Sequence, residues 1–311
     1  MRIVVHGQQA FGKSVLEALL ERGENVVAVY CGPEPAQGGG RMDPLKEAAL
    51  ARELPVFQPR SFRKGPEVKD EFAALKADLC VMAYVTLIVP EEILNLPTHG
   101  TIQYHPSLLP KHRGPSSINW PIMQGETRTG LTIFWPDNGL DTGPILLQKE
   151  VEIRDTDTLG TLYFDRLYPM GVAALLEGVD LVKAGQAPKI VQDESRATYE
   201  GWCKSENVQV DWDKPLQDVW NLVRGADPQP GAGRGDVDLP RLVPRGRGCQ
   251  PQVLRRPATR ADERRIVRPR GRRASLEDQR RADRAPGVLT LRPGQAARRP
   301  ADPRPGRTRS R

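Results

Sequence analysis

Residues 2–30 read RIVVHGQQAFGKSVLEALLERGENVVAVY, and this stretch decides the fold class. The apolar runs at 2–6 and 25–30 are rich in β-branched residues, so each predicts a strand. Between them Val15, Leu16 and Leu19 recur at helical spacing and predict a helix over 12–22. A strand, a helix and a second strand in this order predict parallel strands joined by a right-handed crossover.

The same alternation continues along the chain. Further strands are predicted at 56–57, 79–84, 101–105, 131–135 and 145–151, and further helices at 44–53, 67–74, 117–124, 158–184 and 212–224. Together these elements indicate an α/β fold with a doubly wound, parallel-rich, Rossmann-like sheet. Ligands of such sheets bind at the carboxyl ends of the strands, so the loops after 2–6, 101–105 and 131–135 are candidates for a site.

Charge divides the chain into two unlike parts. The 311 residues carry 46 Lys and Arg against 39 Asp and Glu, a formal net charge of +7. Residues 233–311 hold 23 Arg, 8 acidic residues and no Lys, His or aromatic residue, so the tail carries +15 and residues 1–232 carry −8. We expect a catalytic domain at 1–203, a linker and helix at 204–232 leading to a C-terminal domain, and a disordered, Arg/Pro-rich, low-complexity tail at 233–311.

The composition excludes several classes of protein. No apolar run approaches the roughly 18–20 residues of a membrane span, and the apolar N-terminal run is too short for a signal peptide. We therefore expect a cytoplasmic protein with no membrane partner. The cysteines at 31, 80, 203 and 249 show no CxxC spacing, so we expect reduced thiols rather than disulfides or a zinc site.

The loop after the first strand offers one alternative function. Residues 7–14, GQQAFGKS, fit the pattern G-x-x-x-x-G-K-[ST] between a predicted strand and a predicted helix, the setting of a phosphate-binding loop. Nucleotide hydrolysis also needs an acid after a neighbouring apolar strand to hold Mg²⁺, but Thr86 follows the strand at 79–84. Phe11 is also bulky for a loop that wraps phosphate. A P-loop nucleotide hydrolase is therefore the lesser alternative.

The other two loops carry a candidate acid/base pair. Residues 101–120 read TIQYHPSLLPKHRGPSSINW, which places His105 at the carboxyl end of a strand. Residues 137–143 read DNGLDTG, a loop of turn-forming residues that is longer than a tight hairpin needs. We expect Leu140 to fold this loop back into the protein and to bury Asp141 beside His105. A lone histidine is more often structural, but a buried carboxylate beside an imidazole forms an acid/base pair.

These motifs also resemble a known family. HPSLLP with the following HRG, and GLDTG further along, resemble the folate-dependent formyltransferases, which include methionyl-tRNA formyltransferase and the hydrolase domain of 10-formyltetrahydrofolate dehydrogenase. The resemblance covers residues 1–232, and YHPSLLPKHRG, SSINW, LLQKE and TYEG are most similar to the dehydrogenase's hydrolase domain. It implies the Rossmann-like formyltransferase fold, with 10-formyltetrahydrofolate as formyl donor and no metal.

The resemblance also implies the roles of individual residues. The implied catalytic residues are His105, Asp141 and Gln103. His105 and Gln103 would stabilise an oxyanion, and Asp141 would transfer protons. At the position of Gln103 transferases of the family have Asn, and the hydrolase domain has an apolar residue. The implied pterin slot lies between the loop at 84–90 and the backbone of 137–141. The implied substrate-binding residues are Tyr84, Leu87, Ile88, Pro90, Ser107, Leu108, Leu109, Arg113, Asp137, Gly139 and Leu140.

Two acceptors for the formyl group follow from the resemblance. If water is the acceptor, the protein is a 10-formyltetrahydrofolate hydrolase, and this is the first expectation. If an amine is the acceptor, the protein is a formyltransferase, and initiator methionyl-tRNA is then the candidate partner. A complete dehydrogenase also needs carrier and aldehyde-dehydrogenase domains downstream, so we do not expect the oxidative half-reaction from this polypeptide.

The tail has two interpretations. The resemblance stops at Gly233, and Arg, Pro, Gly and Ala make up 49 of the 79 residues from there onward. All four are encoded by GC-rich codons, so one hypothesis is an out-of-frame reading of a GC-rich gene. The other is an Arg-rich arm that binds RNA phosphate on an inactive scaffold, although it lacks aromatic residues on which bases could stack.

Overall fold

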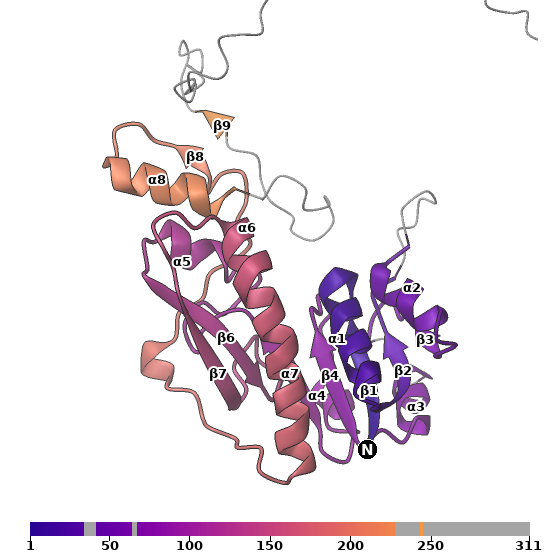
Figure 1. Ribbon diagram of the computed structural model, residues 1–311. Coiled ribbons are helices and arrows are strands. Elements are labelled where there is room, and N and C mark those ends of the chain that lie inside the picture. The colour runs from indigo at the N-terminus through magenta and orange to yellow at the C-terminus, as the bar shows by residue number, and fades with distance from the viewer. Residues whose placement is uncertain (34–41, 64–66, 228–242, 245–311) are drawn as a thin grey trace, which may run out of the picture. The chain divides into compact units, whose positions relative to one another are not determined.

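A seven-stranded sheet forms the centre of the computed structural model, which describes residues 1–33, 42–63, 67–227 and 243–244 (Figure 1). The strand order is β3-β2-β1-β4-β5-β6-β7. The strands are β1 (Arg2–Gly7), β2 (Asn25–Tyr30), β3 (Val56–Phe57), β4 (Leu79–Ala83), β5 (Thr101–His105), β6 (Arg128–Phe134) and β7 (Ile145–Glu152). Each lies within a few residues of its predicted position, so the predicted strands are confirmed.

Strand direction changes halfway across the sheet. The five strands from β3 to β5 pair in parallel, whereas β6 and β7 are antiparallel to their neighbours. In the β5–β6 ladder His105 stands opposite Thr132 and Gln103 opposite Phe134. A doubly wound, parallel-rich sheet is confirmed, with an antiparallel β6–β7 hairpin at one edge.

Helices cover both faces of this sheet. They are α1 (Gln9–Glu21), α2 (Pro44–Leu50), α3 (Glu67–Ala74), α4 (Glu91–Leu94), α5 (Asn119–Met123), α6 (Leu159–Leu162), α7 (Tyr168–Lys183) and α8 (Leu216–Gly225). One apolar core joins α1, α2 and α7 to the sheet, and a second joins α3 and α4 to its other face. In Figure 1, α1 and α7 run side by side across the near face. Burial of apolar side chains on both faces is the main term that holds this arrangement together.

Several helix boundaries differ from the predicted ones. Helix α1 begins at Gln9 rather than at residue 12, and α8 begins at Leu216 rather than at 212. The single helix predicted at 158–184 contains a π-helical turn, η1 (Tyr163–Leu167), between α6 and α7. Pro169, the second residue of α7, has no N–H to donate, so the regular hydrogen-bond ladder is interrupted there. Thr158 caps the first turn of α6 through reciprocal bonds with Thr161.

The C-terminal part of the chain is described only in small part. Strand β8 (Gln209–Val210) pairs in parallel with β9 (Val243–Pro244). The predicted disorder of 233–311, its out-of-frame origin and its RNA binding concern residues outside those described, apart from 243–244. The division at 203 and 232 stays a prediction. None of the described helices combines the length and the apolar character needed to cross a membrane.

Candidate active site

His105 and Asp141 lie next to each other although they are distant in sequence. His105 is the last residue of β5, and Asp141 lies in the loop that joins β6 to β7. Their Nδ1 and Oδ2 atoms are 3.6 Å apart, and the residues are only 5% and 8% exposed. The predicted proximity and burial of the pair are therefore confirmed. The catalytic roles of both residues stay a prediction.

A backbone N–H and a side-chain amide from two other segments hold Asp141 in place. Its φ of 58° is in the left-handed region, which is uncommon for residues other than glycine and is often found at functional sites. Its Oδ2 accepts a hydrogen bond from the N–H of Gly114 at 2.9 Å. Its main-chain carbonyl accepts one from the side-chain amide of Gln192 at 2.9 Å, and the same amide donates to the carbonyl of Gly143 at 2.7 Å. The carboxylate is thus positioned before any substrate arrives.

Only glycine fits at position 114. Its φ of 108° is unfavourable for residues with a side chain, and a Cβ atom there would lie 2.3 Å from the carbonyl oxygen of Glu200. The HRG motif therefore contributes a backbone donor to Asp141 at a point where two chain segments touch.

The orientation of the His105 ring follows from one hydrogen bond. Its Nε2 lies 2.9 Å from the carbonyl oxygen of His112. A carbonyl oxygen can only accept, so Nε2 carries the hydrogen. Nδ1, which faces Asp141, is then bare in the neutral ring and protonated in the imidazolium form. The 3.6 Å gap between Nδ1 and Oδ2 is too long for a direct hydrogen bond, and one oxygen atom can bond to both.

The loop that follows His105 is anchored on the β6–β7 hairpin. The Thr132 hydroxyl donates to the carbonyl of Ser107 at 2.7 Å and accepts from the N–H of Leu109 at 3.1 Å. Ser107 is fully buried and its hydroxyl donates to the carbonyl of Lys111, while Leu108 packs over Gly130 of β6. In the structure, therefore, Ser107, Leu108 and Leu109 support the loop. Their contact with substrate stays a prediction.

Arg113 is buried, and its guanidinium is hydrogen-bonded to other side chains. Its guanidinium donates to Gln192 at 2.8 Å and to both carboxylate oxygens of Glu194 at 2.6 and 2.9 Å. The hydrogen bond to Glu194 raises the pKa of Arg113 further above its ordinary value. Because Gln192 also bonds to Asp141, this cluster braces the acid of the pair. Substrate binding by Arg113 stays a prediction.

The loop at 137–141, one of the two that form the predicted pterin slot, contacts Glu91, the residue that follows the other loop. Asn138 accepts from the N–H of Glu91 at 3.3 Å and donates to the Glu91 carboxylate at 2.5 Å. Residues 84–90 lead directly into α4, which Glu91 begins, so they border the loop at 137–141. Asp137 shapes that loop by accepting from the N–H of Gly139 and from the Thr142 hydroxyl.

Exposure differs among the residues predicted for this slot. Tyr84, Leu87 and Pro90 are half-buried, while Ile88 is 60% exposed. Leu140 is 50% exposed, so the expectation that it folds the loop inward is wrong. Asp141 is buried instead by its polar contacts to Gly114 and Gln192. Backbone polar bonds can draw a loop inward without an apolar anchor.

Gln103 lies on the same face of β5 as His105, because side chains alternate along a strand. Its side chain is half-buried, and no hydrogen bond joins it to another residue in the described part of the chain. Its amide therefore remains available to a bound substrate. Its catalytic role stays a prediction.

The glycine-rich turn at 7–14 does not form a phosphate-binding loop. Only Gln8 lies between β1 and α1, so the remaining residues of the motif are helical. The carboxylate of Asp43 accepts from the N–H of Gln9, Lys13 is 3.7 Å from Glu17, and Ser14 bonds to the Tyr168 hydroxyl at 2.8 Å. The carboxylate of Asp43 thus stands at the start of α1, where a phosphate would have to bind.

Four residues of the site were not foreseen from the sequence: His112, Gly114, Gln192 and Glu200. Gln192 lies in a polar stretch with no recognisable pattern, and the carbonyl of His112 has no side-chain signature at all. The described residues also contain no group of three or more His, Cys, Asp or Glu side chains arranged to hold a metal ion. The expectation of a reaction without metal stays a prediction.

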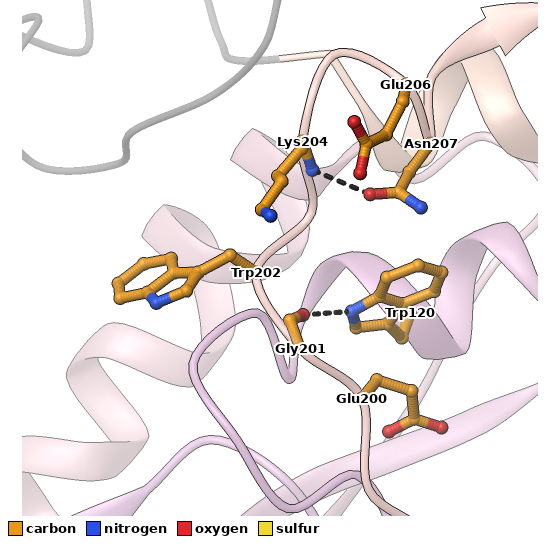
Figure 2. Close-up of a pocket in the computed structure, with 7 residues that line it drawn as sticks. All are labelled: Trp120, Glu200, Gly201, Trp202, Lys204, Glu206 and Asn207. Carbon is orange, nitrogen blue, oxygen red and sulfur yellow. Dashed lines mark hydrogen bonds between the residues drawn. The ribbon is translucent and has the colours of Figure 1, made fainter.

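A cavity of about 460 Å³ opens beside this site. Figure 2 shows it lined by Trp120, Glu200, Gly201, Trp202, Lys204, Glu206 and Asn207. The indole N–H of Trp120 donates to the carbonyl of Gly201 at 3.0 Å, which joins α5 to the segment at 200–207. The wall residue Glu200 is the one whose carbonyl touches Gly114, so the cavity and the acid/base pair share a segment of chain.

The sequence of this chain is similar to that of known proteins. Residues 1–178 match the family described as formyl transferase. The chain is 44% identical over 236 residues to cytosolic 10-formyltetrahydrofolate dehydrogenase of Xenopus laevis, covering 75% of this chain and 26% of that protein. It is 40% identical over 233 residues to methionyl-tRNA formyltransferase of Stutzerimonas stutzeri (strain A1501), covering 74% of each. The chain thus spans about a quarter of the length of the dehydrogenases it matches.

The fold is also similar to that of solved structures. A crystal structure of WlaRD, a sugar 3N-formyl transferase in the presence of dTDP and 5-N-formyl-THF, matches with a TM-score of 0.58. The two chains are 18% identical, and the match covers 72% of this chain and 78% of that chain. At this identity the similarity concerns the fold alone.

Proposed function

This chain belongs to the formyl transferase family, and we propose that it removes the formyl group of 10-formyltetrahydrofolate with water as the acceptor. The observation that carries the proposal is the buried pair of His105 Nδ1 and Asp141 Oδ2, 3.6 Å apart at the carboxyl end of β5. Open α/β sheets bind ligands at that end. The relative named for 10-formyltetrahydrofolate supports the choice of donor.

The first step is attack on the formyl carbon. A water molecule between Nδ1 and Oδ2 has its proton directed at Asp141, whose Oδ2 is held by the N–H of Gly114. As the water oxygen bonds to the formyl carbon, its proton passes to Asp141. The formyl oxygen becomes an oxyanion, which the imidazolium Nδ1–H of His105 and the amide of Gln103 stabilise.

The second step breaks the bond between the formyl carbon and N10. The oxyanion returns its electron pair to the carbon, N10 leaves, and Asp141 gives its proton to N10. The products are tetrahydrofolate and formic acid, which releases its proton to solvent as formate. Asp141 ends the cycle as a carboxylate that can accept the proton of the next water molecule. His105 keeps its ring orientation throughout because Nε2 stays bound to the His112 carbonyl.

An amine acceptor is the second candidate, and two observations favour it. Gln103 offers a side-chain amide where transferases of the family have Asn. The methionyl-tRNA formyltransferase relative matches over 74% of its own length, far more than the 26% of the dehydrogenase. Methionyl-tRNA is therefore the acceptor to test against water.

The test is a product assay on the full chain. Purified protein is incubated with 10-formyltetrahydrofolate, with and without charged initiator tRNA, while tetrahydrofolate and formate are measured. Equal amounts of formate and tetrahydrofolate without tRNA support the hydrolase. Tetrahydrofolate that appears only with tRNA, together with formylmethionyl-tRNA, replaces it with the transferase. No product in either reaction overturns both.

A matched pair of variants tests the role of Asp141. Asp141→Asn removes the proton acceptor and keeps the side-chain shape, so we expect kcat to fall by at least about 100-fold while the Kd for folate changes little. Asp157→Asn is the control, because Asp157 is also buried and also accepts from a backbone N–H, but lies before α6. Turnover retained by Asp141→Asn would remove Asp141 from the mechanism.

A further inference from the structure

His112 is buried between two carboxylates that come from distant segments. Its side chain is 3% exposed. Nε2 lies 3.1 Å from a carboxylate oxygen of Glu126, and Nδ1 lies 3.2 Å from one of Glu200. Glu126 follows α5, and Glu200 belongs to the segment at 200–207 that lines the cavity. A carboxylate thus faces each of the two ring nitrogens.

Other charged groups near this ring reinforce the arrangement. Lys111 reaches Glu126 at 3.4 Å, and the amide of Gln124 donates to Glu200 at 3.3 Å. The hydrogen bond from His112 is the largest cause that lowers the pKa of Glu126 below its ordinary value. Each carboxylate thus has a further side-chain partner besides the ring.

The backbone of His112 adopts a conformation that needs such support. Its φ of 54° is in the left-handed region, which residues with a Cβ avoid. Its N–H donates to the Thr198 hydroxyl at 2.8 Å, and its carbonyl accepts from His105 Nε2 at 2.9 Å. A strained residue persists only where its surroundings determine its position.

We infer that His112 is a positioning residue for the reaction proposed above. Its side chain, held by Glu126 and Glu200, fixes a left-handed main chain whose carbonyl binds His105 Nε2–H. That bond sets the ring orientation in which Nδ1 faces Asp141 and can donate once the ring is protonated, and it keeps the hydrogen on Nε2 while the ring is neutral. The inference rests on the proposed function only for its effect on turnover, because the tautomer of His105 is a property of the free protein.

The direct test is the tautomer itself. ¹⁵N NMR of full-length protein labelled at its four histidines reports which ring nitrogen carries the hydrogen when the ring is neutral. A His105→Gln variant identifies the His105 signals by their loss. We expect the wild-type protein to show His105 with its hydrogen on Nε2. In His112→Asn, which tolerates left-handed φ but loses both carboxylate bonds, we expect a mixture of the two tautomers.

Kinetics supply the second readout. A positioning role predicts that His112→Asn lowers kcat about 10-fold while KM for 10-formyltetrahydrofolate stays within about twofold, since ring alignment matters in the transition state more than in binding. His99→Asn is the control, because His99 is exposed and should leave both the tautomer and kcat unchanged. A double variant Glu126→Gln and Glu200→Gln, which keeps hydrogen-bond acceptors but removes both charges, repeats the test if His112→Asn does not fold.

The outcomes are distinct. Mixed tautomers in His112→Asn, or in the double variant, together with wild-type behaviour of His99→Asn, support the positioning role even if the wild-type protein turns over no folate. An unchanged His105 tautomer in a folded variant overturns it. A changed tautomer with unchanged kcat in an active enzyme overturns the catalytic part and leaves His112 with a structural role.

Discussion

The orientation and the titration of individual polar side chains in this protein depend on the surroundings in which they are buried. Asp141 and His105 are polar groups in a dry setting, and each is oriented by a backbone partner, the N–H of Gly114 and the carbonyl of His112. Because both partners are backbone groups, no side-chain rotamer has to be ordered to make these bonds in each catalytic cycle. The two side chains therefore stay near a productive geometry. Buried His6 lies outside this site and shows the opposite case, a titratable ring among apolar neighbours.

His6 makes stability depend on pH. It lies in β1 against the rings of Tyr30 and Phe62, and burial lowers its pKa from 6.5 to about 3. The folded protein therefore keeps His6 neutral while the unfolded chain takes up a proton below pH 6.5. Stability is thus complete above 6.5 and falls as the pH drops toward 3.

The prediction concerns the difference between wild type and His6→Leu. Lowering the pH from about 7.5 to about 5 should cost the wild type roughly 2 kcal/mol of unfolding free energy more than His6→Leu, because protonation of the unfolded chain alone is worth about 1.4 kcal/mol for each pH unit below the unfolded pKa. Urea unfolding at the two pH values measures this. His99→Gln, on an exposed histidine, should behave like the wild type. An equal loss in wild type and His6→Leu would contradict the proposed cause.

At the scale of elements, the β6–β7 hairpin organises the site. Strand β6 supplies Thr132, which binds the loop after His105 through hydrogen bonds to Ser107 and Leu109 and binds Gln148 of β7 through a third. The connection between β6 and β7 carries Asp141 itself. The hairpin thus supports the loop that follows His105 and carries Asp141 in its connection.

Two buried threonines of β6 give a matched test. Thr132→Val leaves the carbonyl of Ser107 and the N–H of Leu109 without their partner, so we expect a loss of roughly 2–4 kcal/mol in unfolding free energy and a lower kcat/KM. The Thr129 hydroxyl is buried and has no partner among the described residues. Thr129→Val should therefore change stability by less than about 0.5 kcal/mol or increase it. Equal losses in the two variants would show that the hydroxyl bonds to the loop do not matter.

At the scale of the whole molecule, ligand binding separates the two interpretations of the turn after the first strand. A folate that binds the folded state should raise the free energy of unfolding by about 2.7 kcal/mol at roughly 100 times its Kd, a Tm increase of roughly 5–10 °C. We expect this with 5-formyltetrahydrofolate. ATP or GTP with Mg²⁺ should leave Tm unchanged, because residues 9–14 are helical and Asp43 occupies the helix start. Stabilisation by nucleotide that disappears in Lys13→Ala would restore the P-loop interpretation.

Sequence patterns of short range were sufficient for most of the fold. Runs such as 25–30 and 101–105 are recognisable because strand and helix periodicity act within a few residues. Boundaries were less predictable. The start of α1 at Gln9 depends on Asp43 accepting its N–H, and the π-helical turn before Pro169 breaks a helix whose apolar pattern is continuous. Burial of Asp141 was predicted correctly for the wrong reason, since Leu140 remains exposed.

By itself, the sequence determined the α/β class, the separation of an acidic segment from an Arg-rich tail, and the two loops that carry His105 and Asp141. Only the tertiary structure decided which atoms meet: Nε2 of His105 with the carbonyl of His112, and Oδ2 of Asp141 with the N–H of Gly114, 27 positions away. The physical reason is that backbone donors and acceptors have no residue-specific signature. Their partners are selected when distant segments pack and every buried polar group must find a bond.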